Sequence, residues 1–194
     1  METEEQQKRI ETLIYVVRNL MPKLPYHNFN HAIDVYSAVN TLALLDGVNN
    51  EDRFLLKTSA LLHDIIIVPG LKDNEERSAE FARQYLPKIG YSPEQVQKVK
   101  QLILATKLPQ KPQDYLERLL CDADLDNLGR EDFFELGEKV RLELGLPKGI
   151  KWYQQQLEFL RGHEYHTEIA RKLRNSGKAT NIRKLERMLR EEKC

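Results

Sequence analysis

The chain has 194 residues, enough to bury one substantial hydrophobic core but short for two independent domains. Its 30 Lys and Arg residues balance its 30 Asp and Glu residues, so no overall field draws it to a nucleic acid or an anionic membrane. We find no apolar run as long as a membrane span or a signal-peptide core, and therefore expect a cytoplasmic protein without nucleic-acid or membrane partners. The two cysteines, Cys121 and Cys194, suit neither a disulfide framework nor a thiolate zinc site.

Apolar residues recur three and four positions apart along the whole chain, which predicts an all-α fold. Proline and Asp-Gly or Pro-Gly pairs separate the early segments. We expect one domain over residues 1–194, with helices at about 4–20, 28–45, 50–67, 74–86, 93–107, 113–128, 130–144, 151–160 and 164–175, and a charged last segment from 179 onward.

Three of these helices place metal-competent side chains on otherwise apolar stripes. His31 lies on the second helix, His63 with Asp64 on the third, and Asp124 in a row of leucines on the helix over 113–128. A single buried His is more often a hydrogen-bonded core residue than a ligand, and a His-Asp pair is a weak motif by itself. Because two His and two Asp occur together in this way, we interpret them as a site for a divalent metal such as iron, manganese or zinc.

Other polar residues have simpler explanations. We expect Asp122 and Asp126, which flank Asp124, to lie on a solvated acidic face. His163 and His166 do not have HExxH spacing, so we interpret them as surface or packing residues.

Four charged residues keep two interpretations each. Glu75 and Glu76 follow a loop, where acids stabilise a helix N-terminus, but they could also orient a water molecule near the metal. Lys107 suits an exposed surface or a substrate phosphate. Arg141 suits an ion pair with Glu138 or contact with a phosphate.

The segment from Tyr26 to Val35, YHNFNHAIDV, resembles the YHNxxHAxDV signature of 3′,5′-cyclic nucleotide phosphodiesterases, a branch of the HD superfamily of metal-dependent phosphohydrolases. The segments 73–79 and 124–129 are similar to small bacterial predicted HD phosphohydrolases. This resemblance extends over about residues 26–169. It implies an HD-type helical bundle with helical extensions at both ends.

The same resemblance implies a role for each motif residue. His31, His63, Asp64 and Asp124 would bind one divalent ion tightly (Mn, Fe, Zn, Ni or Mg), and Asp64 could bridge to a weak second ion. His27, four residues before His31, would share its helix face if that helix begins early enough, and would act as general acid while metal-activated water attacks the phosphorus.

The substrate implied is a small phosphoester, a 3′,5′-cyclic nucleotide or another nucleotide. The alternatives are a nucleotide phosphomonoesterase or pyrophosphohydrolase and, from another class, a catalytically weak metal-containing regulatory module. The C-terminal part shows no glutamine and aromatic pair recognisable as the purine clamp of the phosphodiesterases. The sequence is compatible with either a monomer or a homodimer.

Overall fold

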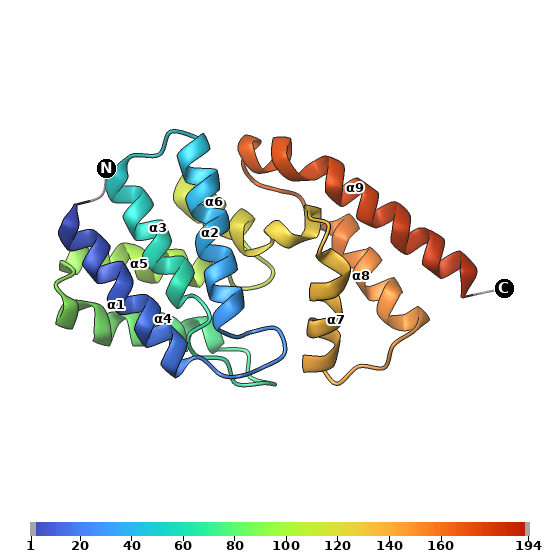
Figure 1. The fold of residues 1–194 in the computed structure, drawn as a ribbon, viewed down its shortest axis with the longest axis horizontal. Helices are drawn as coiled ribbons and strands as arrows, with labels where there is room; N and C mark the ends of the chain where they lie inside the picture. Colours follow the sequence, from blue (N-terminus) through green and yellow to red (C-terminus); the bar gives the residue numbers. More distant parts are fainter. Residues whose placement is uncertain (1–2, 193–194) are drawn as a thin grey trace.

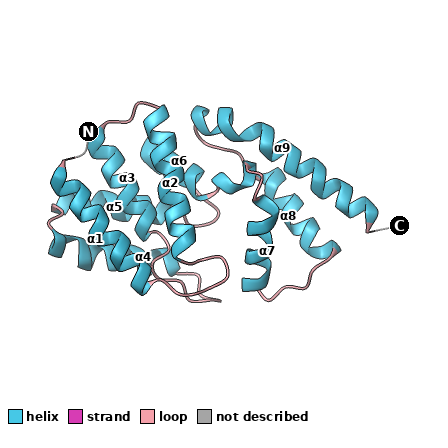
Figure 2. Cartoon of the chain, in the orientation of Figure 1, coloured by secondary structure: helices cyan, strands magenta, loops and turns pink. Residues whose placement is uncertain are grey.

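The computed structural model describes residues 3–192, which contain helices and loops but no strand, so the all-α prediction is confirmed (Figure 2). The elements follow in the order α1 (Glu4–Leu20), α2 (Phe29–Leu45), α3 (Asn50–Leu62), α4 (Asn74–Tyr85), the 3-10 helix η1 (Leu86–Ile89), α5 (Pro93–Ala105), α6 (Tyr115–Asp124), the 3-10 helix η2 (Asp126–Gly129), α7 (Phe133–Glu143), α8 (Ile150–Gly162) and α9 (Glu168–Glu191).

Local capping explains where several of these helices begin. The Asn28 side chain accepts a hydrogen bond from Asn30 N at the start of α2, and Asn49 does the same from Asp52 N at the start of α3. Thr167 caps α9 through Ala170 N. These caps satisfy amide groups that the first helical turn leaves without partners.

The helices form two groups, which Figure 1 shows beside each other along the long axis. Helices α1–α6 enclose the larger hydrophobic cluster, while η2 and α7–α9 enclose a smaller one around Phe133, Trp152 and Leu185. Helix α9 packs against both η2 and α8. Its contact with η2 is close, because a Cβ atom built on Gly177 would lie 1.9 Å from the carbonyl oxygen of Gly129.

Two expected boundaries and one expected placement were wrong. Helix α3 ends at Leu62, so His63 caps it and Asp64 lies in the following turn. Helix α2 begins at Phe29, one residue after its expected start, but His27 precedes it, so the two histidines do not share a helix face. The segments expected as 164–175 and 179 onward form the single helix α9; residues 193–194 lie outside the described part.

The expectation of a solvated acidic face was also wrong, because Asp122 and Asp126 are buried. Asp122 accepts hydrogen bonds from His166 N and from the backbone and hydroxyl of Thr167, which ties α6 to the start of α9. Asp126 pairs with Arg174 of α9 at 2.6 Å and faces Arg130 at 3.4 Å. Both carboxylates join segments distant in the sequence.

None of the described helices is long and apolar enough to cross a membrane.

Candidate metal centre

The four residues expected to bind the metal converge. His31 comes from the first turn of α2, His63 and Asp64 from the end of α3, and Asp124 from the last residue of α6. His31, His63 and Asp124 each offer a ligand atom within 4.8 Å of the others. Asp64 joins this group through both histidines, with its Oδ2 atom 3.4 Å from His31 Nε2 and 3.1 Å from His63 Nε2.

The spacing of these atoms suits a common ion. The two Nε2 atoms are 3.3 Å apart, and Asp124 Oδ1 lies 3.5 Å from His31 Nε2 and 3.3 Å from His63 Nε2. Neighbouring ligand atoms roughly 2.0–2.2 Å from one ion are separated by about 2.8–3.6 Å in tetrahedral or octahedral geometry. The donor set and its spacing therefore fit a divalent transition metal.

Neighbouring hydrogen bonds orient two of these side chains. His63 Nδ1 lies 2.8 Å from the carbonyl oxygen of Ala60, which can only accept, so Nδ1 carries the proton and Nε2 is free as a ligand. Gln110 donates through Nε2 to Asp124 Oδ2 at 3.1 Å, leaving Oδ1 to face the histidines.

Burial and mutual attraction set the protonation of the group. Burial would lower the pKa of His31, but hydrogen bonds with Asp124 and Asp64 outweigh it and raise that pKa. Burial also opposes charge on His63 and Asp64, yet their attraction raises the pKa of His63 well above its usual range and lowers that of Asp64. In the absence of a metal, protons on the histidines thus balance the charge of the carboxylates. A bound divalent cation would replace these protons.

His27 is held at the edge of this centre by Glu143, the last residue of α7. The Glu143 carboxylate accepts hydrogen bonds from the backbone amides of Tyr26 and His27, both at 2.9 Å, and from His27 Nδ1. His27 Nε2 lies 3.8 Å from Asp64 Oδ2. Because Nδ1 faces an acceptor, Nε2 is the ring atom available to a substrate.

A cavity of about 510 Å³ is lined by three of the four residues, His31, Asp64 and Asp124. Its polar end includes His27, Asp64, Glu75 and Asp124. The remaining wall is mostly apolar and comes largely from the second group of helices, through Leu125, Leu128, Phe133, Val140, Leu144, Leu146, Trp152, Phe159 and Leu160. A ligand bound there would place one end at the candidate metal centre and the rest against this wall.

The structure shows different contacts for the four charged residues that had two interpretations each. Glu75 lines the cavity, and burial raises its pKa, as does the nearby Asp64 carboxylate. Glu76 and Lys107 form an ion pair with each other. Arg141 binds Glu138 at 2.6 Å and also the carbonyl oxygen of Leu146, and its side chain does not line the cavity.

The sequence reasoning missed Glu143, Gln110, Asn127 and Gln156. Asn127 and Gln156 line the cavity and are 8% and 9% exposed. Asn127 Oδ1 has no hydrogen-bond partner among the described residues. Asn127 could have been singled out from the sequence, because it follows the expected metal ligand Asp124 by three residues. The sequence around Glu143, Gln110 and Gln156 gives no indication that they lie near the site.

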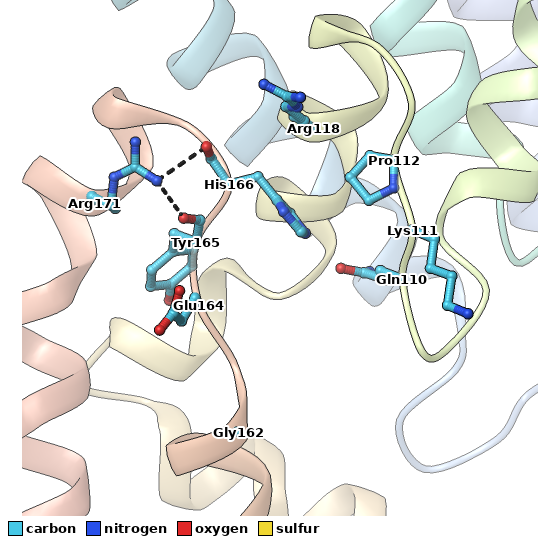
Figure 3. Close-up of a pocket in the computed structure, with 9 residues that line it drawn as sticks. All are labelled: Gln110, Lys111, Pro112, Arg118, Gly162, Glu164, Tyr165, His166 and Arg171. Carbon is cyan, nitrogen blue, oxygen red and sulfur yellow. Dashed lines mark hydrogen bonds between the residues drawn. The ribbon is translucent and has the colours of Figure 1, made fainter.

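A second hollow, of about 520 Å³, lies on the surface near the start of α9 (Figure 3). One wall is the segment from Gly162 to Arg171, and the other is the loop Gln110–Pro112 with Arg118 of α6. Gln110 links it to the candidate metal centre through its bond to Asp124.

Comparison with protein families matches residues 28–126 to the HD domain model, more than half of the chain. The chain belongs to the HD domain family. This HD protein contains His31, His63, Asp64 and Asp124 within the matched range, and the predicted membership is confirmed. Curated protein sequences give no significant match.

Several solved structures share the fold of this HD protein. Bacillus subtilis YpgQ in complex with ADP is 19% identical with a TM-score of 0.70, over 94% of this chain and 96% of that one. A predicted HD superfamily hydrolase from an uncultured Thermotogales bacterium is 22% identical with a TM-score of 0.63, over 95% and 91%. LmjPDEB1 in complex with IBMX is 16% identical with a TM-score of 0.59, over 93% and 83%.

Proposed function

We propose that this HD protein is a metal-dependent phosphohydrolase that acts on a small phosphoester. The observation that carries the proposal is the convergence of His31, His63, Asp64 and Asp124, with 3.1–3.5 Å between facing ligand atoms, beside a cavity that three of them line. A divalent metal bound there would supply an acidified water molecule and positive charge for the phosphate oxygens.

The residues of the chain would divide the remaining work. His27, fixed by Glu143, presents Nε2 at the rim of the ligand group and would donate a proton to the leaving oxygen. Asp64 lies between His27 and the two other histidines, so it would hold the metal and orient the attacking water. Glu75 lies on the same wall and could bind a weak second ion or a water molecule.

The cavity wall favours a nucleotide as the phosphoester. The buried amides of Asn127 and Gln156 could bind the polar edge of a nucleobase, and Trp152 and Phe159 offer aromatic surface for its faces. Gln156 and these two rings are our candidates for the glutamine and aromatic pair that the sequence did not reveal. A 3′,5′-cyclic nucleotide is therefore our leading substrate class.

A nucleoside di- or triphosphate is the second candidate, handled by a phosphomonoesterase or pyrophosphohydrolase reaction. The likeness in fold to YpgQ, whose structure contains ADP, favours it. The wall contributes three carboxylates, from Asp64, Glu75 and Asp124, which disfavour several phosphates in the cavity unless metal ions accompany them.

Metal analysis combined with a substrate screen tests the proposal. Purified protein should contain about one tightly bound divalent ion and hydrolyse a cyclic nucleotide, a nucleotide or a generic phosphodiester when loaded with it. The variants His63→Ala and Asp64→Ala should lose both metal and turnover, whereas His27→Ala should keep the metal and lose rate. The variant Glu138→Gln alters an ion pair with Arg141 that does not line the cavity, and serves as the control.

Two results would overturn the proposal. One is the finding that the purified wild-type protein binds no divalent metal ion tightly. The other is a metal-loaded protein with no activity on any phosphoester tested, which would leave the regulatory module as the better explanation. Full activity of His27→Ala would contradict the general-acid assignment alone.

A further inference from the structure

The surface hollow of Figure 3 carries an excess of positive charge. Lys111, Arg118 and Arg171 line it together with one acid, Glu164, and with His166. Neither Lys111 nor Arg118 has an ion pair or a side-chain hydrogen bond in residues 3–192, although most other arginines of the chain are paired. Unpaired cations that share a hollow favour an anion there.

Hydrogen bonds hold the wall that carries Arg171 and His166. Arg171 Nη1 donates to the carbonyl oxygens of Tyr165 and His166, at 2.9 and 3.1 Å, as the dashed lines in Figure 3 show. Both bonds use Nη1, so the donors on Nη2 and Nε are free of partners within the described chain. Buried Asp122 fixes the same segment through His166 N. The guanidinium is thereby positioned before any ligand binds.

The opposite wall reaches the candidate metal centre. Gln110 lines the hollow, and its Nε2 atom donates to Asp124 Oδ2. In Figure 3 the His166 ring extends across the hollow toward the loop that carries Gln110. An anion between these walls would lie one side chain from a metal-binding carboxylate.

We propose that this hollow is a second binding site, specific for a dianionic phosphate group, and that Gln110 transmits its occupancy to Asp124. Arg118, Lys111 and the free donors of Arg171 provide charge-assisted hydrogen bonds of the kind that phosphate oxygens accept. A volume of about 520 Å³ admits inorganic phosphate or a small organic phosphate such as AMP. The site is separate from the proposed catalytic cavity, and its test requires no turnover.

Amide NMR spectra of the full, chelator-treated protein test the binding. Inorganic phosphate and AMP are titrated separately, with sodium chloride at matched ionic strength as the reference. We expect saturable shifts of the His166 and Thr167 amides, and the ligand that binds more tightly identifies the source of the phosphate group. The double variant Lys111→Gln/Arg118→Gln should lower the affinity at least tenfold.

A matched control removes the same charge elsewhere. Lys8 and Lys88 are exposed and have no ion pair within residues 3–192, so Lys8→Gln/Lys88→Gln should leave phosphate affinity within twofold of wild type. Equal affinities of the two double variants would overturn the proposal. So would phosphate shifts that appear only around His27, His31 and His63, which would place the anion in the catalytic cavity.

The variant Gln110→Leu tests the transmission. In the wild-type protein, phosphate should also shift the amide of Leu125, which follows Asp124. In Gln110→Leu the His166 shift should persist and the Leu125 shift should disappear. An unchanged Leu125 shift in this variant would refute the role of Gln110.

Discussion

Replacing Glu143 by Gln should impair catalysis without removing the metal. The Glu143 carboxylate accepts from Tyr26 N, His27 N and His27 Nδ1. An amide has one acceptor oxygen and an NH2 group that cannot accept, so at least one of these donors loses its partner. Each charge-assisted bond contributes about 1.5–3 kcal/mol, and about 1.4 kcal/mol corresponds to a tenfold change in rate. We therefore expect kcat to fall about 10- to 100-fold.

The dependence of the rate loss on the leaving group distinguishes the positioning of His27 by Glu143 from a general disruption of the site. If Glu143 positions His27 as the acid, a phosphodiester with a good leaving group such as p-nitrophenolate should lose less rate than one with an alkoxide leaving group. His27→Ala should show the same pattern, and Glu138→Gln, on the same helix, should behave as wild type. Elemental analysis should find the metal content of Glu143→Gln unchanged. Wild-type kcat, or equal losses for both leaving groups, would refute the reasoning.

Two further predictions concern stability. Burial, with help from the charge of Lys178, lowers the pKa of His163 to about 4, so below pH 6.5 the unfolded chain binds a proton at this residue more readily than the folded chain does. In urea unfolding, the stability of wild type relative to His163→Gln should therefore fall by roughly 1 kcal/mol per pH unit between pH 6 and 4. A stability difference that stays constant over this pH range would contradict the prediction. The variant Gly177→Ala should be destabilised by about 1–3 kcal/mol, because its Cβ atom would meet the Gly129 carbonyl. The control variant Gly162→Ala has open space around the new Cβ atom and should be neutral or stabilising. A higher Tm for Gly177→Ala than for wild type would contradict the close packing of Gly177 on Gly129.

The sequence predicted those features that depend on local spacing. Residues three and four apart share a helix face, so the apolar pattern revealed the all-α class. His31 and Asp124 interrupt apolar rows, and a buried polar side chain without a partner is costly, which singled them out before the fold was known. The resemblance over residues 26–35 then added His27.

Contacts between distant segments could not be predicted in this way. Glu143 reaches His27 across 116 positions of sequence, and its own helix gives no sign of that contact. Asp122 and Asp126 resemble a solvated acidic run because the groups that bind them, Thr167 through hydrogen bonds and Arg174 through an ion pair, lie more than 40 positions away. Such pairings depend on the tertiary packing of α9, which the local periodicity of the sequence does not reveal.

The proposed function would assign chemistry and recognition to different helical groups. The proposed ligands come from α2, α3 and α6, whose side chains are fixed in the larger core. Most of the apolar wall comes from η2, α7 and α8, which surround the smaller core. Under the proposed function, substitutions in the smaller group would therefore change which phosphoester fits while the arrangement of the four proposed ligands persists. Glu143 is the exception, because it lies on α7 yet orients His27, so movement of α7 would alter substrate fit and proton donation together.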